Sequence, residues 1–151
     1  MGGHGRALVT AAELVGQELV SDWREVSQAR IDLFAEATDD PQWIHVDPAR
    51  AAAGPFGTTI AHGFLTLSLV VPMFEEALPR LDGTSLTVNY GLNRVRFTAP
   101  LPSGSRIRGR FRVEAVEDVS GGEQATVAVT IEREGHEKPV CVAEALFRFL
   151  G

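Results

Sequence analysis

A change in hydrophobic period near residue 85 constrains this fold more than any other feature of the sequence. Residues 62–78 are apolar nearly all round until Glu75, which is typical of a buried helix. From Leu86 onward, apolar and polar residues alternate, and the pattern predicts strands at 86–98, 105–118, 123–133 and 139–149, separated by turn residues. One buried helix followed by hairpin-connected strands predicts an α+β fold, in which an antiparallel sheet curls around the helix.

Capping signals predict shorter elements in the first forty residues. Thr10 begins a capping box and predicts a short helix over residues 11–15. A strand is expected at 18–23, and Ser27 can cap a helix that ends near Asp39. We expect a single domain over residues 1–151, with a flexible start over residues 1–9.

The segment TDDPQWIHVDP carries the first candidate site. Pro41 and Pro48 disfavour helical geometry in the residues before them, so we expect an ordered loop. Asp40 and His45 lie on this loop and can converge on one water molecule. A histidine exchanges protons near neutral pH, and a neighbouring carboxylate can orient water. The structural alternative is a turn aspartate and a loop histidine, which the pattern alone favours.

The sequence AHG at the start of the apolar helix is a second candidate. Gly63 falls in the first helical turn, where backbone N–H groups have no partner within the helix. Such an N–H can stabilise a negatively charged oxygen, and glycine permits close approach of a carbonyl. Alternatively, Gly63 serves loop packing and His62 is a polar residue at a helix start.

Together the two features suit a reaction in which charge develops on a carbonyl oxygen while water adds nearby. Hydration of an α,β-unsaturated thioester meets this description. Water attacks the β-carbon, the thioester oxygen becomes enolate-like, and the α-carbon takes a proton. Dehydration is the reverse.

Over nearly the whole chain, the sequence resembles the MaoC-like hydratases and dehydratases, also called hydratase 2. The resemblance rests on D40-P-Q-W-I-H45-V-D47, then P55-F-G, I60-A-H-G63 and S68, in this order. It implies the hotdog fold, an antiparallel sheet around a long central helix. It also implies that Asp40 and His45 form the acid/base pair and that the Gly63 N–H is an oxyanion donor.

One position departs from the usual pattern. Gln42 and Trp43 replace the common Asn-Pro, as in a branch that resembles nodulation protein N, which NYGLNRVRF also resembles. Trp43 either shapes the substrate pocket or packs beneath the loop. We predict that His62 also binds substrate.

Arginines on two strands are candidates for contact with phosphates of coenzyme A or with an acidic carrier protein. Their alternation places Arg106, Arg108, Arg110 and Arg112 on one sheet face, which is more simply a solvated surface. Within the stretch that resembles the family, Arg96 is the preferred substrate-binding candidate.

Net charge and cysteine content argue against several classes of function and of structural site. The net charge of −6 argues against nucleic-acid binding. Cys141 is the only cysteine, which excludes an internal disulfide and a cysteine-based zinc site and suits a reducing cytoplasm. The N-terminus lacks a secretory signal, and the longest apolar run is too short to span a bilayer. We predict no cofactor and no metal.

The resulting prediction is a cytoplasmic enoyl-CoA hydratase. The alternatives are a 3-hydroxyacyl-carrier-protein dehydratase, a hotdog thioesterase and a non-catalytic module that binds acyl thioesters. Many hotdog thioesterases resemble one another in having a carboxylate on the central helix, whereas residues 62–74 contain none. The family resemblance further implies a homodimer, joined edge to edge through its sheets, and a product of R configuration.

Overall fold

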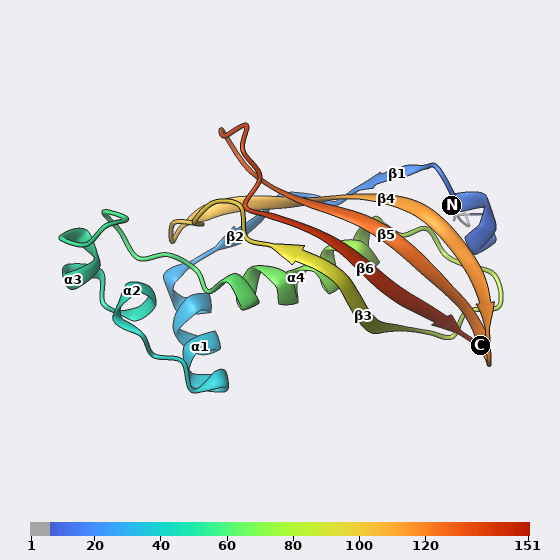
Figure 1. Ribbon diagram of the computed structural model, residues 1–151, viewed down its shortest axis with the longest axis horizontal. Coiled ribbons are helices and arrows are strands. Elements are labelled where there is room, and N and C mark those ends of the chain that lie inside the picture. Colours follow the sequence, from blue (N-terminus) through green and yellow to red (C-terminus); the bar gives the residue numbers. More distant parts are fainter. Residues whose placement is uncertain (1–6) are drawn as a thin grey trace, which may run out of the picture.

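A curved antiparallel sheet arches over one long helix in the computed structural model, which describes residues 7–151 (Figure 1). The long strands are β3 (Leu86–Arg96), β4 (Ser105–Val119), β5 (Gly122–Arg133) and β6 (Cys141–Leu150). Their order is β1-β4-β5-β6-β3, and β2 also pairs with β4. The predicted α+β arrangement is confirmed. Each long strand lies where period-two alternation and the flanking turn residues predicted it.

The central helix, α4 (Gly63–Ala77), packs one face against the concave side of the sheet. Phe74 is fully buried and stacks on Phe147 of β6, with 4.3 Å between ring centroids. The prediction that this helix is buried all round is wrong for one face, because the side chain of Phe64 is 69% exposed. The described chain covers the helix from one side only, so apolar residues on its other side stay accessible.

The predicted strand at 18–23 is two strands, β1 (Glu18–Val20) and β2 (Arg24–Val26), both paired with β4. Between them, the Ser21 hydroxyl accepts a hydrogen bond of 2.9 Å from the Gly109 N–H. That side-chain contact interrupts the regular ladder. Just before β1, the predicted capping box is confirmed and begins the 3-10 helix η1 (Ala11–Leu14).

Three helices project beyond one end of the sheet (Figure 1). The first, α1 (Gln28–Thr38), is capped as predicted by Ser27, which accepts from the Arg30 N–H. The expected loop that follows instead contains two short helices, α2 (Trp43–Val46) and α3 (Pro48–Ala52). The prediction missed α3 although Asp47 and Pro48 supply its cap and first residue, a common helix start.

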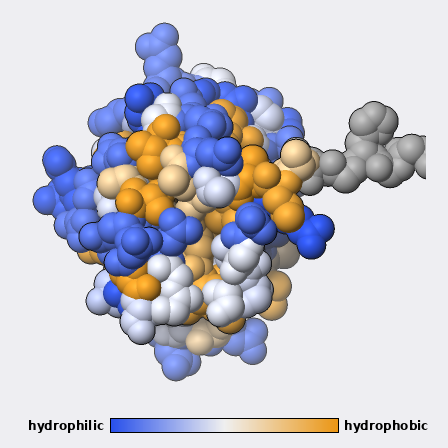
Figure 2. Space-filling view, turned by 90° about the vertical axis from the view of Figure 1, so that its right-hand side faces the viewer, coloured by the Kyte–Doolittle hydropathy of each residue, from blue (hydrophilic) through white to orange (hydrophobic). Residues whose placement is uncertain are grey.

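The opposite end of the molecule carries both ends of the described chain, and Figure 2 shows its apolar residues in patches broken by polar ones. Val9 pairs with Leu81, so this part of the predicted flexible start belongs to the fold. Residues 1–6, the rest of that prediction, lie outside the described part of the chain. Within residues 7–151, no helix is both long and apolar enough to cross a membrane.

Candidate active site

Asp40 lies in the turn that ends α1, and this turn sets its position in the site. Asp39 adopts a left-handed conformation, with φ of 55°, and the Asp40 N–H donates to the Ala35 carbonyl. This bond closes the helix and leads the chain out toward α2. The Asp40 carboxylate is 53% exposed and is therefore accessible to water and substrate.

His45 sits on α2 with its side chain buried, only 7% of the residue being exposed. Its Nδ1 lies 2.7 Å from the Ile60 carbonyl oxygen. A carbonyl can only accept, so Nδ1 carries the proton and, in the neutral ring, Nε2 keeps a free lone pair. Burial lowers the pKa of His45 below its usual 6.5, and neighbouring His62 adds to this lowering, while the Ile60 carbonyl and Asp40 oppose it.

His62, the residue before α4, links the two predicted catalytic residues. Its Nε2 donates to the Asp40 main-chain carbonyl over 3.0 Å and lies 4.0 Å from the Asp40 carboxylate. Its ring stacks on His45, with 3.8 Å between centroids, and tilts against Phe34. Within the described residues its buried Nδ1 has no hydrogen-bond partner.

Asp40, His45 and His62 therefore form one cluster, in which one polar atom from each lies within 4.8 Å of the others. This spacing is compatible with a metal ion, but the ring arrangement is not. The planes of the two imidazoles are stacked and only 23° apart, so the lone pairs, which lie in these planes, do not meet at one nearby point. The cluster is better suited to holding water than to ligating a cation.

Gly63 is the first residue of α4, where the backbone N–H has no carbonyl partner within the helix. A Cβ at this position would lie 2.9 Å from the ring of Phe97. A larger residue at position 63 would therefore make the Phe97 ring move. The packing explanation and the oxyanion explanation for Gly63 are compatible, since packing concerns the Cα position, which faces the Phe97 ring, and the oxyanion role concerns the backbone N–H.

The other two predicted substrate-binding residues lie away from this cluster. The Trp43 ring lies 4.4 Å from the Arg50 guanidinium and packs closely on Gly54, so it joins α2 to α3. Arg96 is exposed at the end of β3 and donates to the carbonyl of Val95. In the described chain, no hydrogen bond or ion pair connects either side chain to Asp40 or His45.

The arginine-rich face of β4 is largely neutralised by carboxylates. Arg108 pairs with Glu132 over 2.7 Å, and Arg110 pairs with Glu18 and Glu132. Arg106 pairs with Glu134 over 3.0 Å. This pairing supports the solvated-surface interpretation over a phosphate-binding one.

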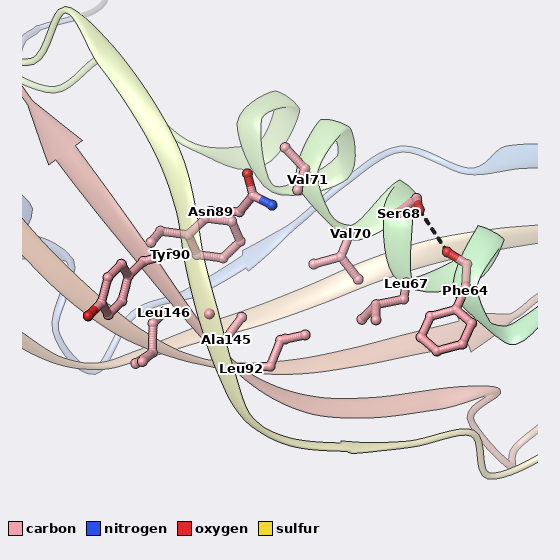
Figure 3. A pocket seen from close by; sticks show the side chains of 12 residues that line it. Phe64, Leu67, Ser68, Val70, Val71, Asn89, Tyr90, Leu92, Ala145 and Leu146 are labelled. Carbon is pink, nitrogen blue, oxygen red and sulfur yellow. Dashed lines mark hydrogen bonds between the residues drawn. The ribbon is translucent and has the colours of Figure 1, made fainter. Parts of the chain in front are cut away.

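An apolar cleft of about 290 Å³ runs between α4 and β3, and its lining begins in sequence at Phe64, the residue after Gly63, without including Asp40, His45 or His62. Figure 3 shows Phe64, Leu67 and Val71 on the helix side, with Asn89 extending toward the helix from β3. The Tyr90 ring points away from the helix, where Arg148 lies over it at 3.6 Å. The volume of the cleft lies just below the roughly 300–1,000 Å³ range of small-molecule sites.

Gln28, at the start of α1, is a contact residue of the site that the sequence pattern did not indicate. Its amide N–H donates to the His45 main-chain carbonyl over 2.7 Å, and its amide oxygen accepts from the Thr59 hydroxyl over 2.6 Å. A glutamine in the first turn of a helix carries no distinctive motif, so only the structure identifies it.

Known proteins resemble this chain over most of its length. Residues 10–135 match the model of the MaoC-like domain family. The chain is 55% identical to 3-hydroxyacyl-thioester dehydratase Z of Mycobacterium tuberculosis over 141 residues, covering 93% of this chain and 91% of that protein. It is 46% identical to nodulation protein N of Rhizobium leguminosarum over 143 residues, covering 93% and 89%.

Solved structures show the same architecture. R-hydratase PhaJ1 from Pseudomonas aeruginosa superimposes with a TM-score of 0.74 at 26% identity, covering 90% of this chain and 81% of that one. An (R)-hydratase from A. caviae gives a TM-score of 0.75 at 25% identity, covering 89% and 96%. The predicted hotdog fold is confirmed, and fold and relatives together define a hydro-lyase. The chain belongs to the MaoC-like family.

Proposed function

We propose that this enzyme reversibly adds water to trans-2-enoyl-CoA and gives (R)-3-hydroxyacyl-CoA. The observation that carries the proposal is the meeting of Asp40 and His45 beside the first turn of α4. The R configuration and the thioester substrate rest on the family and on the named activities of its members.

In the proposed mechanism, the water lies between Asp40 and His45. The Asp40 carboxylate accepts one hydrogen of the water and orients it, and His45 Nε2, unprotonated in the observed arrangement, takes the other as oxygen attacks the β-carbon. The Gly63 N–H stabilises the enolate oxygen. Protonated His45 then delivers its proton to the α-carbon, so one water supplies both the hydroxyl group and the hydrogen.

The test is spectrophotometric loss of the conjugated enoyl thioester on adding enzyme to crotonyl-CoA and longer enoyl-CoAs. Asp40→Asn and His45→Gln should each lower kcat by about 10²–10⁴-fold, the usual contribution of a positioned acid or base. Circular dichroism checks that both variants remain folded. Retention of activity within about tenfold, or roughly 1.4 kcal/mol of barrier, removes the residue from this role.

The same cluster can act on a carrier-protein thioester in the dehydration direction. The relative from Mycobacterium tuberculosis is named as a 3-hydroxyacyl-thioester dehydratase, which favours the dehydration direction. Offering the 3-hydroxyacyl group on coenzyme A and on an acyl carrier protein, at equal concentration, separates the two substrates.

Thioester hydrolysis and binding without turnover predict different observations. The acidic residues of α4, Glu75 and Glu76, lie at its far end, and Glu76 pairs with Arg24. A thioesterase would release free thiol, which a thiol reagent detects. A binding module would bind enoyl-CoA without changing its absorbance.

For the rest of the substrate, we propose that the acyl chain enters the cleft at Phe64 and that Arg96 meets a phosphate of coenzyme A. Trp43 and His62 border the route to the reacting carbons, with Trp43 acting through the position of α2. Arg96→Gln should raise KM several-fold and leave kcat unchanged, because Arg96 lies outside the acid/base cluster.

A homodimer is part of the proposal. β3 is the last strand of the sheet order, and its exposed side chains include Leu86 (49%), Val88 (37%) and Tyr90 (56%). An exposed apolar edge strand favours pairing with a second copy. A cytoplasmic location stays a prediction.

A further inference from the structure

Three segments meet at the side chain of Gln28. One amide hydrogen donates to the His45 carbonyl at 2.7 Å, and Nε2 also lies 2.9 Å from an Asp32 carboxylate oxygen. The amide oxygen accepts from the Thr59 hydroxyl at 2.6 Å. With two acceptors at its nitrogen and a hydroxyl donor at its oxygen, the amide has one orientation that satisfies every partner.

These contacts fix both ends of the bond that sets the His45 tautomer. The donor of that bond is His45 Nδ1, and the acceptor is the Ile60 carbonyl. Gln28 holds the donor through the main chain of His45 and the acceptor through Thr59, the neighbour of Ile60. The Ile60 N–H also donates to the Ile44 carbonyl, so α2 and residues 59–60 form one hydrogen-bonded unit with Gln28 beside it.

We propose that Gln28 is a positioning residue that holds His45 in the tautomer with the proton on Nδ1. Its effect on catalysis rests on the proposed role of His45 as the proton acceptor. Without the Gln28 bonds, the link between α2 and residues 59–60 depends on the main-chain bond from Ile60 to Ile44. This weaker link lets other orientations of the His45 ring compete with the Nδ1 bond to the Ile60 carbonyl. His45 Nε2 is consequently the acceptor in only part of the molecules.

Two variants test this proposal by kinetics. Gln28→Met removes all three polar contacts at similar length, and Gln28→Glu keeps an acceptor for Thr59 but has no amide hydrogen for the His45 carbonyl. We expect kcat to fall at least about tenfold in both, with KM within about threefold, as expected when ground-state binding is preserved. Asp32→Ala is the matched control. It removes only the exposed partner of Gln28, and kcat should stay within about twofold, the small effect usual for a surface substitution.

Imidazole ¹⁵N chemical shifts give a readout that does not depend on turnover. In the wild-type protein above pH 7, His45 should show one tautomer, protonated on Nδ1, and in Gln28→Met a mixture with the Nε2-protonated form. Unchanged shifts in both Gln28 variants, or unchanged kcat, overturn the proposal. Failure of the proposed function is a separate result: the wild-type protein would not turn over any enoyl thioester, while the tautomer comparison would still decide the role of Gln28.

Discussion

The imidazole of His62 stacks on that of His45, with 3.8 Å between ring centroids and 23° between ring planes. At this distance the two rings cannot both carry a positive charge without strong repulsion. Each ring donates to a main-chain carbonyl, His45 to Ile60 and His62 to Asp40. The stack therefore disfavours a state in which both imidazoles are charged.

The acid limb of the pH profile should reflect this arrangement. Burial and His62 lower the pKa of His45 below 6.5, and His45 must be neutral to accept the proton of water. Hydration activity should therefore persist as pH falls through 6.5 and be lost only at lower pH. The measurement is kcat/KM for enoyl-CoA hydration between pH 5 and 8. A midpoint above 6.5 contradicts the assignment of the limb to His45.

Replacement of His62 by phenylalanine should move that limb to higher pH. The variant keeps an aromatic ring against His45 but removes the charge interaction that lowers the pKa of His45. It also removes the hydrogen bond to the Asp40 carbonyl, so kcat should fall about tenfold or more, as expected for a misplaced catalytic group. His136→Phe, at an exposed turn, is the control and should leave the profile unchanged.

Gly63→Ala tests whether the space at the start of α4 serves packing, catalysis or both. The new Cβ would contact the Phe97 ring at 2.9 Å, so we expect a lower melting temperature. It would also crowd the oxyanion position, and kcat should fall by up to about 10²–10³-fold, as when an oxyanion donor is lost. Adding Phe97→Ala relieves the contact and should restore stability. Full recovery of kcat in the double variant would assign Gly63 to packing alone.

Val88→Lys should weaken the proposed dimer. The substitution places a charge at the exposed edge of β3, where pairing with a second copy would bury it. Light scattering after size-exclusion chromatography should show a monomer at concentrations where the wild-type protein is a dimer. Val20→Lys, on the opposite edge strand β1, is the matched control. A dimer that survives the Val88 change places the interface elsewhere.

Much of the fold follows from local signals in the sequence. Thr10 and Ser27 mark helix starts through their side chains, and alternation from Leu86 onward marks the long strands. The missed elements have physical reasons. The break after Val20 depends on a hydrogen bond between Ser21 and Gly109, 88 residues apart in the chain, and the single turn of α2 is too short to show a helical period.

The site was predictable only in part for the same reason. Asp40 and His45 are five residues apart, so one short segment can bring them together. The stacking of His62 on His45 and the contacts of Gln28 with His45 and Thr59 depend on how distant segments pack. No spacing in the chain encodes such contacts.

The hydrogen bonds that orient His45 and His62 both end on main-chain oxygens, those of Ile60 and Asp40. Every residue type supplies the same carbonyl, so replacing the side chain of Ile60 leaves that acceptor in place. The indole of Trp43 is likewise outside these bonds. The orientation of the two imidazoles is thus independent of the side chains of Ile60 and Trp43, so these two positions can vary in sequence while the hydrogen bonds that set the ring orientations are kept.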